Sequence, residues 1–126
     1  MLNQHLLDND INVHSSSIKY LKLERVTCDF CELSHLIQYT PYLQRISVNS
    51  IYGFPDQQVH APMLSITSMK ILYHGYIATL INLFQNLSNL LYLTLETFDI
   101  YCDGCEWEQI LMTYLSTLKI FQLKMI

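Results

Sequence analysis

The chain of 126 residues has few charged residues and few residues that break regular backbone structure. Asp, Glu, Lys and Arg make up 14% of it, and it contains three glycines and three prolines. This composition excludes collagen-like, linker-like and intrinsically disordered chains. Because 51% of the residues are apolar, a chain of this length can bury a core, and we expect one domain over residues 1–126.

The sequence also lacks basic clusters and long apolar runs. Its seven Lys and Arg are scattered singly and its formal net charge is -4, so it has no positive stripe for nucleic acid. The longest apolar stretch, residues 76–95, is interrupted by polar side chains, and the first ten residues carry Asp where a secretory leader carries bases. We therefore expect no membrane span, and four reduced cysteines in the cytoplasm or nucleus.

An internal repeat is the strongest pattern in the sequence. Five segments carry apolar anchors with the spacing L-x-x-L-x-L, and their first anchors lie 25, 23, 24 and 28 residues apart. Leucine-rich repeats have periods of roughly 20 to 29 residues. The five anchor triplets are Ile18, Leu21 and Leu23; Leu43, Ile46 and Val48; Ile66, Met69 and Ile71; Leu90, Leu93 and Leu95; and Leu118, Phe121 and Leu123.

Between the anchors the apolar period changes from that of a strand to that of a helix. The spacing predicts helices over about 30–39, 76–87 and 104–114. In the second repeat Pro55 and Pro62 interrupt the corresponding stretch, which predicts a loop. The third strand is placed by evenness of spacing, with Ile66 rather than Met69 as its first anchor.

These patterns predict an α/β fold of about four to five strand-helix units, arranged as a leucine-rich-repeat-like solenoid with a parallel sheet. Residues 1–17 are expected to form an N-terminal cap or the remnant of a preceding repeat. The last strand ends at Ile126 with no polar cap behind it. Since unpaired terminal strands invite association, we expect a fragment of a longer solenoid or a partly self-associating piece.

Two C-x-x-C pairs, Cys28 with Cys31 and Cys102 with Cys105, suggest a zinc site or thiol chemistry. More than 70 residues separate the pairs, whereas zinc ribbons place them roughly 15 to 20 apart. In the predicted solenoid they lie roughly 15 Å apart, if strands stack at about 4.8 Å. That separation is too large for shared Zn–S bonds of about 2.3 Å.

Both pairs read Cys-Asp-x-Cys-Glu at the start of a predicted helix. Asp29 with Glu32, and Asp103 with Glu106, have the spacing of a capping box. We therefore interpret Cys28 and Cys102 as small buried packing residues in the turns from strand to helix. The alternative function is a thiol redox or zinc-binding protein that uses the two C-x-x-C pairs. Redox chemistry stays open because the dipole of a helix N-terminus can acidify a dithiol.

Residues between and after the anchors are expected on the open side of the sheet, where they could bind a protein partner of unknown identity. The sequence carries no phosphate loop and no assembled catalytic set, so we predict a non-enzymatic scaffold without a cofactor. The predicted face consists of Tyr20, Lys22, Glu24, Arg45, Ser47, Asn49, Lys70, Tyr92, Thr94, Glu96, Gln122 and Lys124.

Several stretches resemble the C-terminal region of F-box proteins that carry degenerate leucine-rich repeats. They are residues 81–95 (INLFQNLSNLLYLTL), 104–111 (GCEWEQIL), 114–119 (YLSTLK) and 121–125 (FQLKM). The resemblance implies that the repeats hold a target of a cullin ubiquitin ligase. It implies a Skp1-type adaptor as a second partner only where an F-box precedes this region, since the F-box itself is not in these residues.

Overall fold

The computed structural model describes residues 17–59 and 61–126, which form five parallel strands alternating with three helices. The strands are β1 (Tyr20–Asp29), β2 (Arg45–Gly53), β3 (Ser68–Gly75), β4 (Tyr92–Phe98) and β5 (Ile120–Met125). The helices are α2 (Phe30–Gln38), α3 (Ile77–Gln85) and α4 (Gly104–Tyr114). The predicted α/β class with a parallel sheet is confirmed. The cap predicted over residues 1–17 lies outside the described residues, apart from Ser17.

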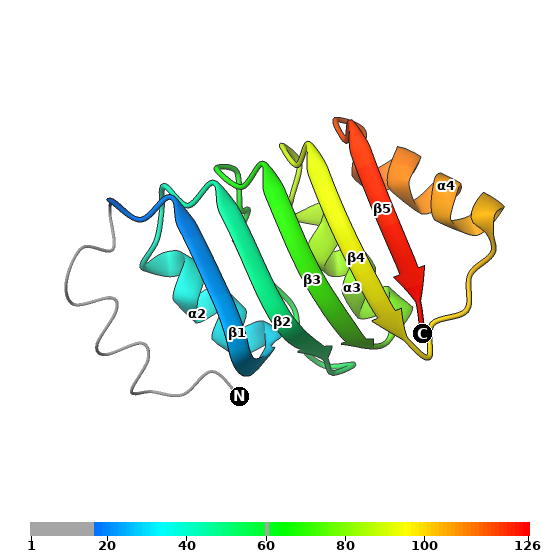
Figure 1. The fold of residues 1–126 in the computed structure, drawn as a ribbon, viewed down its shortest axis with the longest axis horizontal. Helices are drawn as coiled ribbons and strands as arrows, with labels where there is room; N and C mark the ends of the chain where they lie inside the picture. The colour runs from blue at the N-terminus through cyan, green and yellow to red at the C-terminus, as the bar shows by residue number, and fades with distance from the viewer. Residues whose placement is uncertain (1–16, 60) are drawn as a thin grey trace.

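The strands follow one another across the sheet in chain order, and all three helices lie on the same side of it (Figure 1). Strands carry successive side chains to opposite sides, so one side of each strand is covered by helices and the other is not. We call the uncovered side, which faces the viewer in Figure 1, the open face.

The predicted anchors pair in register across the sheet. The second anchors form one row, Leu21, Ile46, Met69, Leu93 and Phe121, and the third anchors form the next, Leu23, Val48, Ile71, Leu95 and Leu123. The predicted placement of the third strand is therefore confirmed. Anchors in β2, β3 and β4 are buried, whereas Phe121 and Leu123 in β5 are half-buried, because β5 has a strand neighbour on one side only among the described residues.

Two of the helices begin at the capping boxes that the sequence predicts. The Asp29 side chain accepts a hydrogen bond of 2.8 Å from the Glu32 N–H, and the Glu32 carboxylate accepts one of 3.4 Å from the Asp29 N–H. Asp103 and Glu106 make the same reciprocal pair at 2.8 and 3.3 Å before α4. Each pair satisfies two N–H groups at the helix start, so it fixes the first residue of the helix.

A loop takes the place of a helix between β2 and β3, as the two prolines predict. Asparagine side chains of α3 and its C-cap hold this loop: the Val59 N–H donates to Asn82 Oδ1 at 2.8 Å, and Asn86 Nδ2 donates to the Val59 carbonyl at 3.4 Å. Val59 and Met63 are buried, and they fill the layer that a helix would otherwise occupy. The loop is thus a packed part of the core.

The register between β2 and β3 shifts after Val48, where β2 contains one more residue than β3 before pairing resumes at Ile51. Such a bulge reverses the side to which the following side chains point. Ile51 is consequently buried in the core, and Tyr52 is exposed on the open face. The bulge is therefore the reason that Tyr52, near the end of β2, lies on the open face.

We predict that Gly75→Ala destabilises the protein by about 2 kcal/mol or more. Gly75 has a φ of 135°, and a Cβ there would collide with the Gly53 backbone on the neighbouring strand. The matched control is Gly104→Ala, whose Cβ would meet open space within α4 and should change stability by at most about 1 kcal/mol. Urea unfolding of both variants tests this; equal effects would contradict the close approach of β2 and β3.

Candidate functional site

The open face of the sheet carries every residue predicted for it, and all twelve are exposed or half-buried on the strands. Strand pairing arranges them in rows that cross the sheet. The first row runs Tyr20, Arg45, Ser68, Tyr92, Ile120, and the second runs Lys22, Ser47, Lys70, Thr94, Gln122. Glu96 and Lys124 pair in a third row, and Glu24 and Asn49 follow the second row on β1 and β2. The sequence did not single out Ser68 or Ile120.

The first two rows enclose a hollow of about 250 Å³, which we call the cationic hollow. Three cationic side chains line it, with three hydroxyls and two tyrosines, and none of its described lining residues is Asp or Glu. Its polar and aromatic lining consists of Lys22, Arg45, Lys70, Ser47, Ser68, Thr94, Tyr20 and Tyr92. The arrangement offers hydrogen-bond donors and positive charge to a ligand.

A second hollow of about 390 Å³ adjoins the first toward the middle of the strands. It shares Lys22 and Lys70 with the cationic hollow, but Glu24 and Glu96 also line it, so its charges are mixed. The Lys22 Nζ lies 2.8 Å from Glu24 Oε1. This hydrogen-bonded ion pair raises the pKa of Lys22 and lowers that of Glu24, and both groups are fully solvent-exposed.

Aromatic rings form a row on the open face near the C-terminal ends of the strands. His74 stacks on Phe98 at 4.5 Å between ring centroids and on Tyr52 at 5.6 Å, and Tyr52 lies 5.0 Å from Phe54. Tyr52, His74 and Phe98 pair directly in the register of β2, β3 and β4. Sequence reasoning missed this row, because simple alternation from Ser47 and Asn49 points Tyr52 into the core, and only the bulge in β2 turns it outward.

The structure keeps the two C-x-x-C pairs apart. Cys28 is the next-to-last residue of β1 and Cys102 follows β4, with β2 and β3 between these strands. Cys28 is buried, and that burial raises the pKa of its thiol to about 12; burial also raises the pKa of Cys102. Cys31 and Cys105 are exposed. A buried thiol with a raised pKa is a poor nucleophile at neutral pH, which supports the packing interpretation of Cys28. Cys102 is half-buried, so the predicted burial of this second cysteine is only partial.

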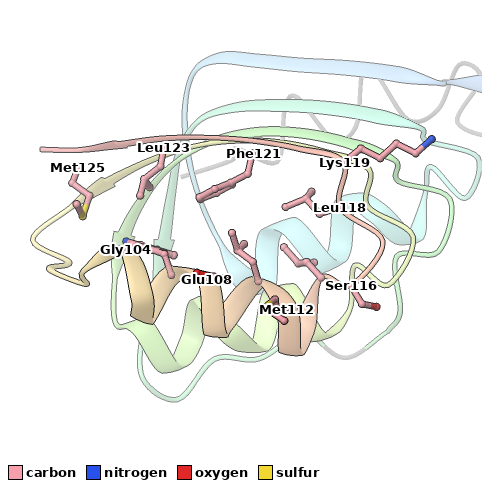
Figure 2. Close-up of a pocket in the computed structure, with 12 residues that line it drawn as sticks. Gly104, Glu108, Met112, Ser116, Leu118, Lys119, Phe121, Leu123 and Met125 are labelled. Atoms are coloured by element: carbon pink, nitrogen blue, oxygen red, sulfur yellow. The ribbon is translucent and has the colours of Figure 1, made fainter.

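An apolar cleft of about 560 Å³ lies at the end of the molecule, between α4 and β5. Figure 2 shows Leu118, Phe121 and Leu123 extending from the β5 side toward α4, with Met112 on the helix opposite them. Only Glu108 and Lys119 bring charge to its lining. The cleft can therefore accept apolar side chains, and it is separate from the polar hollows of the open face.

Searches against protein-family models, curated proteins and solved structures find no match for this chain. The resemblance to F-box proteins therefore stays a prediction from the residues quoted above. Within residues 17–59 and 61–126, no three His, Cys, Asp or Glu side chains gather in a way that could hold a metal ion. Over the same ranges, no helix combines the length and the apolar character that crossing a membrane requires.

We predict that alkylation of the folded protein follows the burial of the four thiols. Cys31 and Cys105 should react first with iodoacetamide at neutral pH, Cys102 more slowly, and Cys28 only as the protein unfolds. Mass spectrometry of the digested protein measures the order, and in urea all four should react at similar rates. Rapid labelling of Cys28 in the folded protein would contradict its assignment to the core.

The raised pKa of Cys28 also predicts a loss of stability in alkali. The pKa of the Cys28 thiol is raised from its ordinary value of 9.0 to about 12 in the folded protein. Between these two pH values the unfolded chain releases the thiol proton, while the folded chain retains it. The free energy of unfolding is therefore unaffected below pH 9 and falls as the pH rises through this window. Cys28→Ala should flatten the decline measured by urea unfolding between pH 8 and pH 11, whereas the exposed-site control Cys31→Ala should leave it unchanged. Equal slopes in both variants would refute the burial effect.

Proposed function

We propose that this chain is a non-enzymatic protein-binding module, built as a leucine-rich-repeat-like solenoid, and that its open face holds the partner. The single observation that carries the proposal is the open face itself. Helices cover the opposite side of the sheet, while the twelve polar and aromatic side chains lie on the uncovered side, where ten of them line two hollows. Regular rows of accessible side chains on a rigid sheet are suited to contacting an extended surface.

The solenoid part of the proposal is supported by the order of the strands and the phase of their anchors. Five strands follow in chain order, each pairs in parallel with the next, and the same anchor positions pair at every step. Stacking units of this kind share one continuous core, since a single strand and helix cannot bury its own apolar side.

The side chains of the open face have the chemistry of protein interfaces. Tyr20 and Tyr92 are 52% and 43% exposed, and the guanidinium of Arg45 lies over the Tyr20 ring at 5.1 Å. Tyrosine and arginine are enriched among residues that dominate binding energy, because each offers a large contact area with a polar end. The row of Tyr52, His74 and Phe98 forms a second aromatic surface at the opposite ends of the strands.

The thiols support a structural role over thiol chemistry. Asp29 and Asp103 cap helices beside the two C-x-x-C pairs, and burial holds the pKa of Cys28 far above neutral pH. All four cysteines are free, which suits a reducing compartment such as the cytoplasm or nucleus.

The resemblance to F-box proteins gives the module its place in a larger process. On that basis we infer that the open face holds a target of a ubiquitin ligase. A Skp1-type adaptor is a partner only if an F-box precedes this region, and we assign no adaptor-binding residue within these 126 residues.

Site-specific photo-crosslinking tests the proposed function. A benzophenone amino acid in place of Tyr92 should capture a distinct protein partner, because that position lies on the open face. The same group at Gln109, exposed on α4, is the matched control and should not capture that partner. Binding of the purified partner to the purified chain should weaken at least about tenfold in the double variant Tyr20→Ala, Tyr92→Ala. Capture from Gln109 alone, or unchanged affinity of the double variant, would overturn the proposal.

A further inference from the structure

Positive charge gathers in the cationic hollow although the chain as a whole is negative. Lys22, Arg45 and Lys70 line this one hollow and make up three of the seven Lys and Arg in a chain of net charge -4. No Asp or Glu is among the described residues of its lining. The charged residues described in this lining are therefore opposite in sign to the net charge, and they favour an anionic ligand at this point of the open face.

Two of the three cations are available to a ligand. Lys22 is held by Glu24 at 2.8 Å, and this is the only ion pair among the described residues. Arg45 lies over the Tyr20 ring, an arrangement that leaves its N–H groups free to donate. Lys70 stands on the central strand with Ser47 and Thr94 as its paired neighbours. Glu96 lines the adjoining hollow with it, but no described residue forms an ion pair with Lys70.

Hydroxyl groups complete the set of donors. Ser47, Ser68 and Thr94 also line the hollow, and each hydroxyl can rotate to donate a hydrogen bond. Thr94 Oγ1 has only a long contact of 3.5 Å with Gln122 Oε1, which a better acceptor would replace. The hollow therefore presents two unpaired cations together with three hydroxyl donors.

This donor set fits a phosphoryl group better than a carboxylate. A phosphate monoester carries a charge of about -1.5 to -2 and three acceptor oxygens at neutral pH, so it matches two cations with several further donors. A carboxylate carries one charge and two oxygens, and would leave part of the set unused. The exposed rings of Tyr20 and Tyr92 at the edge of the hollow can contact the residues on either side of a modified one.

We propose that the cationic hollow, through Arg45, Lys70 and the hydroxyls between them, binds a phosphorylated side chain of an extended protein segment. This inference rests on the proposed function, since it names the chemistry of the partner that the open face receives. Binding weakens as salt is added, because the attraction is between charges at a solvent-exposed surface.

Short degenerate peptides with a fixed central phosphoserine, phosphotyrosine, glutamate or serine test the inference, with the purified chain and fluorescence polarisation as the readout. One of the phosphorylated libraries should bind about tenfold or more tightly than the glutamate and serine libraries. Arg45→Gln and Lys70→Gln should each reduce that affinity about tenfold. Arg25→Gln removes the same charge from an exposed position of β1 that lines neither hollow, and it should change affinity by less than about twofold.

Thermal unfolding checks that the three variants remain folded, as expected for exposed side chains. Equal binding of phosphorylated and unmodified peptides, no binding of either, or an equal loss in Arg25→Gln would overturn the inference. Binding to vesicles containing a phosphoinositide without binding to any phosphopeptide would overturn it as well. If a partner captured through position 92 binds equally well after phosphatase treatment, this inference is refuted and the proposed function is not. If a partner is captured only through position 109 on α4, the proposed function is refuted.

Discussion

The structure depends on one constraint, which is that apolar anchors from five strands pack side by side beneath a single sheet. Ile46, Met69 and Leu93 stand in one row and are buried against the helix layer. Because side chains alternate along a strand, burying these residues on one side sends the residues between them to the other. The open face is thus a direct consequence of the core, and its rows are as regular as the anchors.

Much of this arrangement is predictable because its signals are local in the sequence. The predicted bounds of α4 agree with the structure, since Asp103 and Glu106 set its start. The loop before β3 follows from Pro55 and Pro62, which interrupt the helix period. The anchors give the register of all five strands, because shifting a strand by one residue would turn its apolar side chains to solvent.

Other features depend on contacts that spacing alone does not encode. The bulge after Val48 reverses the phase of β2, so the exposed position of Tyr52 and its stacking on His74 follow from strand pairing. Ser68 precedes the anchor Met69 as Arg45 precedes Ile46, so strand pairing places it in the first row, although the sequence pattern singled out only Lys70 on β3. The cationic hollow combines side chains from four strands, and their charges are scattered in the sequence. Only the folded sheet brings Lys22, Arg45 and Lys70 together.

The most direct test of the central claim is a set of interstrand nuclear Overhauser effects in the isotopically labelled chain. In-register parallel pairing predicts contacts from the side chain of Met69 to those of Ile46 and Leu93, and the weak interstrand α-proton cross-peaks of parallel strands. Strong α-proton cross-peaks between consecutive strands, as antiparallel hairpins give, would contradict the account. The common core and the open face would then no longer follow from the anchors.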